Sequence, residues 1–162
     1  MIRVGLGYDL HRLVRGRPFI LAGIRLQAKR GELAHSDGDV LAHAVCDALL
    51  GASALGDIGS LFPPSDERWK DADSMRMLAS VYDLVRERGW NLVNLDCIVN
   101  CEEPRILDYR DEIRANLARV LRTEADRIFV KGKTGEGVGK VGKGRAVQVW
   151  ATCLLDNPEK EA

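Results

Sequence analysis

Three side chains within the first 43 residues could together hold one metal ion. Asp9 and His11 lie two positions apart in a segment that reads as a β-strand, so both side chains point to the same side. His43 follows in a helical segment, where Asp39 and Asp47 lie four residues away on the same face and either carboxylate could orient the imidazole. Two imidazoles and one carboxylate leave the fourth position of a tetrahedral zinc open, as catalytic sites do. The joint pattern predicts a catalytic divalent metal, with zinc the first choice although other metals would fit.

A polar segment, residues 35–39 (His-Ser-Asp-Gly-Asp), comes directly before the helix that carries His43. Ser36 or Asp37 could cap that helix, and Asp39 would be favoured by the helix dipole. The cap would position the loop, which would leave His35 free to act in the site.

A glycine-rich loop, residues 131–145, contains six glycines and five basic residues. Glycines let backbone amides approach a phosphate, and Lys133, Thr134 and Glu136 offer a cation, a hydroxyl donor and a carboxylate for a second cation. A flexible hairpin connection with solvated lysines is the alternative. Residues 137–142 also satisfy Gly-x-Gly-x-x-Gly, and residues 137–143 satisfy the start of a P-loop. Both motifs require a helix to follow, whereas a strand-like segment follows here, so neither motif holds.

Hydrophobic periodicity and turn residues predict the elements that position these side chains. The expected strands and hairpin are 2–9, 18–26, 92–100, 128–131 and 146–155; the expected helices are about 39–55, 74–88 and 104–122; residues 59–66 are expected to form a loop. This order predicts a single catalytic domain, 1–162, of the α/β class: an α+β sandwich with helices packed on one face of a mixed sheet. Residues 156–162 are expected to be a polar tail.

Charge and cysteine content exclude several classes of function. The 24 basic and 24 acidic side chains cancel, so bulk charge does not indicate binding to nucleic acid or to a membrane surface. No signal peptide and no apolar run of about 20 residues is present in the sequence. The four cysteines form no Cys-x-x-Cys pair and are expected to be buried, reduced thiols. We expect a cytoplasmic protein, or an organellar one without its transit peptide.

Several motifs occur in one order along the chain. They are Gly7–His11, Leu33–Asp39 with His43, Asp47–Ala52, Leu55–Gly59, Leu61–Pro63 and Asp71–Ser74. With these motifs the chain resembles the 2-C-methyl-D-erythritol 2,4-cyclodiphosphate synthase family over essentially its whole length. The resemblance implies a lyase of non-mevalonate isoprene biosynthesis, which converts 4-diphosphocytidyl-2-C-methyl-D-erythritol 2-phosphate into the cyclic diphosphate and CMP. It also implies a homotrimer with active sites at subunit interfaces, one zinc per subunit, and a magnesium or manganese ion on the substrate diphosphate.

The resemblance also implies roles for individual residues. Asp9, His11 and His43 would bind zinc, and His35 and Thr134 would be catalytic. Residues 101–107 and 133–136 would enclose the cytidine diphosphate, with Glu136 on the second metal. The full expected substrate-binding set is Asp9, His11, His35, Ser36, Asp57, Ile58, Gly59, Phe62, Pro63, Ser65, Asp66, Cys101, Pro104, Arg105, Leu107, Lys133, Thr134 and Glu136.

The chain departs from the family pattern in the glycine-rich loop. The family often has Thr-Thr-Thr-Glu where this chain has residues 133–136, Lys-Thr-Gly-Glu, so the matching threonine and glutamate are present. Lys140 and Lys143 stand where the family often has phenylalanine and arginine, in a region said to line a cavity for isoprenoid diphosphates. Arg105 replaces a common lysine, which keeps the charge but changes its geometry.

Three other functions remain open on the residues alone. A zinc phosphodiesterase or phosphatase would use the same ligands to activate water. A non-catalytic metal-binding or nucleotide-binding module would use the same loops without chemistry. An enzyme that hydrolyses nucleoside triphosphates is disfavoured because the P-loop context fails.

Overall fold

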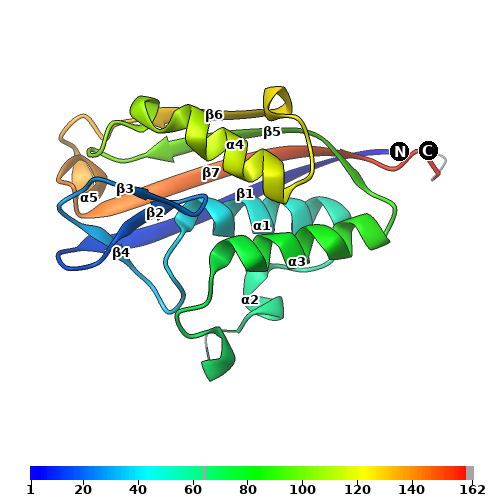
Figure 1. The fold of residues 1–162 in the computed structure, drawn as a ribbon, viewed down its shortest axis with the longest axis horizontal. Coiled ribbons are helices and arrows are strands. Elements are labelled where there is room, and N and C mark those ends of the chain that lie inside the picture. The colour runs from blue at the N-terminus through cyan, green and yellow to red at the C-terminus, as the bar shows by residue number, and fades with distance from the viewer. Residues whose placement is uncertain (64, 160–162) are drawn as a thin grey trace.

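The computed structural model describes residues 1–63 and 65–159. A five-stranded sheet runs through the molecule in the order β4-β1-β7-β5-β6 (Figure 1). Its strands are β1 (Ile2–Val14), β4 (Gly31–Leu33), β5 (Asn91–Asn100), β6 (Ile128–Lys133) and β7 (Ala146–Asp156). β5 and β6 pair in parallel and the other neighbours are antiparallel, so the sheet is mixed, as expected.

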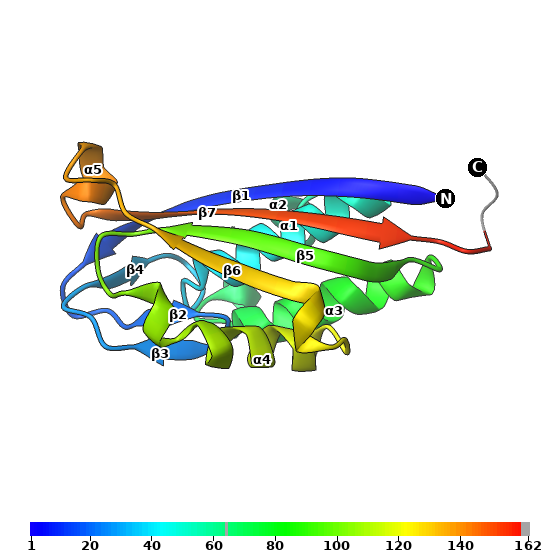
Figure 2. The same ribbon diagram turned by 90° about the horizontal axis from the view of Figure 1, so that it is seen from above.

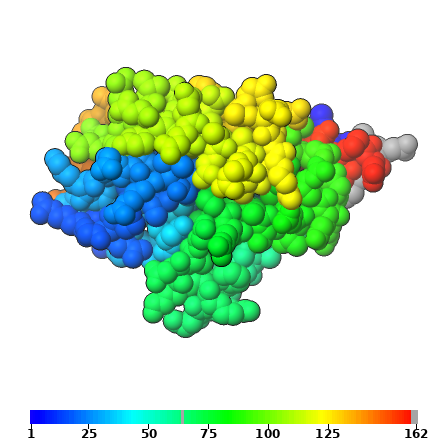
Figure 3. All heavy atoms as spheres, viewed as in Figure 1, coloured from blue at the N-terminus to red at the C-terminus, as the bar shows by residue number. Residues whose placement is uncertain are grey.

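The three long helices cover one face of this sheet (Figure 2). They are α1 (Val40–Ser53), α3 (Ser74–Glu87) and α4 (Arg110–Val120). Shorter helical turns are α2 (Ile58–Leu61), α5 (Gly139–Gly142), η1 (Glu67–Trp69), η2 (Ile106–Asp108) and η3 (Ala125–Arg127). The segment that carries α2 and η1 projects from the body of the molecule beside α1 and α3 (Figure 3). None of the described helices has the length and apolar character needed to cross a membrane.

The core lies where α1 packs on β1 and β7, and two glycines of β1 allow the close approach. A Cβ added at Gly5 or Gly7 would lie 1.9 Å from the carbonyl oxygen of Ala48 or Ala44, so no other residue fits there without moving α1. Side chains alternate along a strand, and the odd-numbered residues of β1 therefore face α1. This is the face on which Asp9 and His11 lie.

The three long helices leave the other face of the sheet uncovered, and this face is apolar along β1. The even-numbered residues Ile2, Val4, Leu6, Tyr8 and Leu10 are all exposed, with Leu6 68% accessible. The Tyr8 ring lies 5.3 Å from the ring of Trp150 on the neighbouring strand β7. One chain therefore leaves a continuous apolar strip uncovered.

The expected hairpin is confirmed as β2 (Phe19–Leu21) and β3 (Ile24–Leu26), joined at Ala22 and Gly23. Two distant groups hold its turn in place. The Asp39 carboxylate accepts a hydrogen bond from the Gly23 amide at 2.7 Å, and the Asn116 side chain on α4 donates to the Ala22 carbonyl. The short strand β4, which was not expected, pairs with the end of β1 and extends that strand to Val14.

Several predicted boundaries were wrong. The helix expected from residue 104 begins only at Arg110, because the turn η2 comes first. The expected loop 59–66 begins inside α2, and the glycine-rich loop contains the turn α5. β7 continues to Asp156, and Asn157 is buried, so the segment expected as a tail starts within the fold; residues 160–162 lie outside the described residues. All four cysteines are free and buried, as predicted.

Candidate functional site

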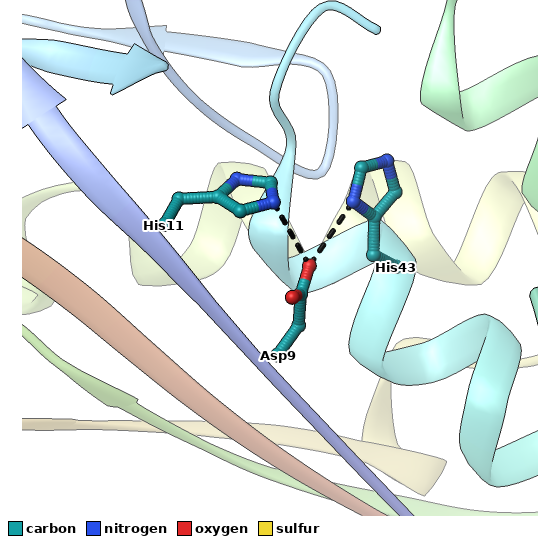
Figure 4. A group of neighbouring side chains, drawn as sticks. All are labelled: Asp9, His11 and His43. Atoms are coloured by element: carbon teal, nitrogen blue, oxygen red, sulfur yellow. Dashed lines mark hydrogen bonds and ion pairs between the residues drawn. The ribbon is translucent and has the colours of Figure 1, made fainter. Parts of the chain in front are cut away.

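The three predicted metal ligands converge (Figure 4). The Asp9 Oδ2 atom lies 3.1 Å from His11 Nε2 and 3.1 Å from His43 Nδ1, with β1 supplying the first two residues and α1 the third. Donors bound tetrahedrally to one zinc at about 2.0–2.2 Å lie about 3.3 Å apart, so these three atoms are spaced for one ion. Across residues 1–63 and 65–159, this is the one group of three or more such side chains close enough to share a metal.

The far nitrogen of His11 is fixed by a backbone carbonyl. His11 Nδ1 lies 2.8 Å from the carbonyl oxygen of Gly38. A carbonyl only accepts, so Nδ1 carries a proton, and Nε2 is the nitrogen left to bind a metal. Such a partner fixes both the tautomer and the ring orientation that a metal requires.

The far nitrogen of His43 is fixed by a serine from another helix. His43 Nε2 lies 2.9 Å from the hydroxyl of Ser74, and that hydroxyl donates to the Asp37 carboxylate. Ser74 therefore accepts from Nε2–H, which leaves Nδ1 free to bind a metal. The hydrogen bonds from His43 to Ser74 and from Ser74 to Asp37 therefore fix the tautomer and orientation of His43, as the Gly38 carbonyl does for His11.

The expectation that Asp39 or Asp47 orients His43 was wrong. Asp39 is the N-cap of α1 and accepts from the Ala42 amide at 3.0 Å. Asp47 accepts from the Ile58 amide at 2.8 Å and so holds the start of α2. Both carboxylates are used by backbone donors, which leaves the imidazole to the Ser74 hydroxyl.

The predicted helix cap was also misplaced by two or three residues. Ser36 and Asp37 do not cap α1; they accept from the amides of Gly38 and Asp39, two residues further along, and shape the turn before the helix. Gly38 in that turn has φ of 89°, a left-handed conformation that favours glycine. The turn thereby aims the Gly38 carbonyl at His11.

Burial and the neighbouring metal ligands shift the pKa values of Asp9 and His11 in opposite directions. Burial opposes ionisation of Asp9, but hydrogen bonds and charge from His11 and His43 outweigh it and hold the Asp9 pKa well below its usual range. Burial likewise opposes the charged form of His11, yet Asp9 outweighs it and raises the His11 pKa. The carboxylate is therefore ionised and ready to bind a cation at neutral pH.

The ligands open into a pocket of about 250 Å³, which we call the metal pocket. Of the predicted substrate-binding residues, His11, His35, Ser36, Ile58, Gly59 and Phe62 line it, together with His43, Ala34, Trp69 and Met77. The projecting segment with α2 and η1 forms one wall, where the Phe62 and Trp69 rings pack edge to face at 4.8 Å.

Asp9 and four predicted substrate-binding residues of the projecting segment do not line the metal pocket. Asp57 is the N-cap of α2 and accepts from the Ser60 amide and hydroxyl. Asp66 is paired with the Arg68 guanidinium at 2.6 Å. Pro63 and Ser65 complete the set that stays outside the pocket, on the same projecting segment.

A second pocket, of about 380 Å³, forms where the chain leaves β5 and β6; we call it the nucleotide pocket after the ligand expected there. The predicted residues Cys101, Pro104, Arg105, Leu107, Lys133 and Thr134 line it, with Glu102, Ile106, Arg110 and Gly132. Glu136 lies next to it, since the Thr134 hydroxyl donates to its carboxylate at 2.7 Å. The two pockets share no lining residue, so one chain does not join them into a single cavity.

Unpartnered buried polar atoms gather in the two pockets. Within the described part of the chain, four buried side-chain nitrogen or oxygen atoms lack a hydrogen-bond partner. Three of them belong to pocket-lining residues: His35 Nε2 and Trp69 Nε1 in the metal pocket, and Arg110 Nε in the nucleotide pocket. Buried polar groups are normally satisfied, so these atoms point to ligands that complete them.

Sequence reasoning missed Ser74, Trp69 and Arg110. Ser74 entered the sequence analysis only as the last residue of the Asp71–Ser74 motif, and no local pattern indicates its contact with a histidine 31 positions away. Trp69 and Arg110 lie in segments expected to be irregular or helical, where their types alone indicate no ligand.

Comparison with known proteins agrees with this geometry. Residues 2–156 match the YgbB family. A relative from Treponema denticola named 2-C-methyl-D-erythritol 2,4-cyclodiphosphate synthase is 54% identical over 95% of this chain and 96% of its own length. A solved structure of 2C-methyl-D-erythritol-2,4-cyclodiphosphate synthase in a CDP-bound form has a TM-score of 0.87 and 41% identity, over 95% of this chain and 100% of that one.

A longer protein contains the same fold. The bifunctional IspDF from Campylobacter jejuni has a TM-score of 0.92 and 41% identity; the match covers 96% of this chain and 42% of that protein. The family match, the identity to curated relatives and the shared fold all extend over nearly the whole chain. The chain therefore belongs to the YgbB family, the family of the 2-C-methyl-D-erythritol 2,4-cyclodiphosphate synthases.

Proposed function

We propose that this chain converts 4-diphosphocytidyl-2-C-methyl-D-erythritol 2-phosphate into 2-C-methyl-D-erythritol 2,4-cyclodiphosphate and CMP, as a lyase of non-mevalonate isoprene biosynthesis. The observation that carries the proposal is the oriented group Asp9, His11 and His43, which opens into a pocket lined by His35. The names of the matched relatives support the same reaction. We propose that it takes place in the cytoplasm, where buried thiols stay reduced.

The reaction needs no nucleophile from the protein. An oxygen of the substrate's own 2-phosphate attacks the β-phosphorus, a new P–O–P bond forms, and the bond from the β-phosphorus to the bridging oxygen breaks. That oxygen leaves with its electron pair as part of CMP. The work left to the protein is to hold the substrate curled and to stabilise the charge that develops on phosphate oxygens.

The residues of the two pockets divide this work. Zinc bound by the three ligands would supply positive charge beside a phosphate oxygen. His35, with an unpartnered ring nitrogen in the metal pocket, would donate to the reacting phosphate. The Thr134 hydroxyl would turn from the Glu136 carboxylate to a phosphate oxygen, which frees that carboxylate for a magnesium or manganese ion.

We further propose a homotrimer with active sites between neighbouring copies. The uncovered apolar strip along β1 is the kind of surface that another subunit covers. The metal pocket and the nucleotide pocket are separate in one chain, although the substrate joins a cytidine diphosphate to the erythritol part. A neighbour that brings its nucleotide pocket to the metal pocket of this chain would complete the site.

Phosphorus NMR of the purified protein with the cytidylyl substrate, zinc and magnesium tests the reaction. We expect CMP together with the two coupled signals of a cyclic diphosphate. CMP with a linear product would instead identify a zinc hydrolase that activates water. The absence of any turnover would favour a non-catalytic binding module. Sedimentation of the same sample measures the number of subunits, and a monomer at working concentration would contradict the trimer.

A further inference from the structure

Arg110, the first residue of α4, both packs on a neighbouring ring and lines the nucleotide pocket. Its guanidinium carbon lies 5.1 Å from the ring centre of Phe129 on the edge strand β6. The side chain lines the nucleotide pocket, and its Nε atom is buried without a hydrogen-bond partner. A buried guanidinium nitrogen without a partner costs free energy, so a bound group that accepts from it would stabilise the site.

A second arginine on the same ring shows what a structural role looks like. Arg114, one turn further along α4, places its guanidinium carbon 5.5 Å from the Phe129 ring centre. Its Nε donates to the Ile128 carbonyl at 2.7 Å and its NH2 group to the Ala125 carbonyl at 2.7 Å. Arg114 thus ties α4 to β6 and the turn before it. Arg110 has no such bond and faces the pocket instead.

The nucleotide pocket carries more positive than negative charge. Arg105, Arg110 and Lys133 line it, and none of them forms an ion pair with a carboxylate in the described part of the chain. The lining carboxylate is Glu102, which accepts from the Gly135 amide at 3.1 Å. Three cations around one acid favour an anionic ligand, and a planar guanidinium binds phosphate oxygens through two parallel donors.

We propose that Arg110 is a nucleotide-binding residue, seated on the Phe129 ring and supplying charge to the phosphate-bearing part of a nucleoside diphosphate. The proposal rests on the proposed function, because that function places a cytidine diphosphate in this pocket. The ring holds the guanidinium in place before binding, so little side-chain entropy is lost when the ligand arrives.

Calorimetric titration of the full chain with CDP, CMP and uncharged cytidine tests the role of Arg110. We expect Arg110→Met to weaken CDP binding about tenfold, CMP binding less, and cytidine binding by less than about twofold. Arg110→Gln, which keeps polar length without charge, should behave like Arg110→Met and serves if that variant folds poorly. Arg119→Met is the matched control: it removes the same charge from the same helix at an exposed position where the guanidinium contacts Asn116.

The outcomes separate this proposal from the function on which it rests. If the wild-type chain binds CDP and the Arg110 variants bind it equally well, the role of Arg110 is wrong and the proposed function stands. Equal weakening for CDP and cytidine would also overturn the proposal, since it would show that Arg110 only shapes the pocket wall. If the wild-type chain binds neither CDP nor CMP, the nucleotide pocket itself fails, and the role of Arg110 fails with it.

Discussion

The metal pocket and the nucleotide pocket are built in opposite ways. The metal pocket joins β1, α1, the turn before α1 and the projecting segment, and hydrogen bonds to Gly38 and Ser74 fix its two imidazoles before any ion binds. The nucleotide pocket uses the segment between β5 and α4, the first residue of α4 and the end of β6, and its cations form no ion pair with a carboxylate of the described residues. Hydrogen bonds between distant elements therefore hold the metal pocket in its binding geometry, whereas the cations of the nucleotide pocket are left to pair with a charged ligand.

The largest effect should come from removing a metal ligand. Loss of a supporting hydrogen bond typically lowers metal affinity 10–100-fold, so His43→Ala should lower zinc affinity by more than about 100-fold. The fold should survive, because the pocket is held by other contacts of α1. Zinc titration measures the affinity, and far-UV circular dichroism measures whether the fold is retained. The matched change His35→Ala should keep zinc but lose activity; full zinc occupancy in His43→Ala would contradict the metal site.

A change that touches no ligand should also break the metal pocket. An alanine at Gly7 would place Cβ 1.9 Å from the Ala44 carbonyl oxygen, next to His43, and force α1 away from β1. We expect Gly7→Ala to cost about 3 kcal/mol of stability in urea unfolding. Gly51→Ala is the control, since nothing lies within 4 Å of that added Cβ and alanine favours the helix. An equal effect of both changes would show that the spacing of α1 and β1 is not tightly set.

The nucleotide pocket can be disabled without disturbing the metal. Thr134→Ala removes one donor to the reacting phosphates and should lower kcat about 100-fold, as loss of a comparable donor does elsewhere. Zinc content should stay at the wild-type level because Thr134 does not line the metal pocket. Thr134→Ser keeps the hydroxyl and should recover most of the rate. A Thr134→Ala variant with the wild-type rate would remove this residue from the mechanism.

The smallest effect concerns Glu32, which lies behind the Gly38 turn of the metal pocket. Burial, with the nearby charges of Asp39 and Asp37, raises the pKa of Glu32 to about 9 from an ordinary value of 4.5. Between these values the unfolded chain releases a proton that the folded chain keeps. Stability should therefore fall as pH rises from about 5 to 9.

Urea unfolding at several pH values checks this sign. Glu32→Gln keeps an acceptor for the Ile20 amide, which now donates to Glu32 Oε2 at 3.0 Å, and removes the titration. Its stability should exceed that of the wild type above pH 7 and fall less steeply. Glu87→Gln, at the exposed end of α3, serves as the control. Parallel curves for wild type and Glu32→Gln would show that Glu32 ionises freely in the folded chain.

The two pockets also differ in how far the sequence predicts them. Asp9 and His11 could be placed together because a two-residue spacing in a strand fixes the direction of both side chains. The contact between His43 and Ser74 could not, since it depends on how α3 packs beside α1. In the nucleotide pocket, the glycine-rich loop indicated Lys133 and Thr134, whereas the other predicted residues came from the resemblance. The contact of Arg110 with Phe129 depends on where α4 begins, and that boundary was misplaced by six residues.

The sheet and its helices were predictable because burial alternates in the strands and repeats in the helices. The short elements β4 and α5 were not predicted. β4 depends on pairing with β1, and α5 depends on two glycines that come close: a Cβ at Gly135 would lie 2.4 Å from the Gly142 amide nitrogen. Local sequence carries little information about such contacts.

Subunit complementation tests most directly the claim that one copy's metal pocket works with another copy's nucleotide pocket. His43→Ala and Thr134→Ala chains, each with at most about 1% of the wild-type activity alone, are co-expressed with different tags, and the mixed assemblies are purified through both tags. In a closed ring of three that contains both variants, one of the three sites has two intact halves, so activity should return to about a third of the wild-type level. Activity no higher than that of the separate variants would contradict a shared site and place the whole reaction within one chain.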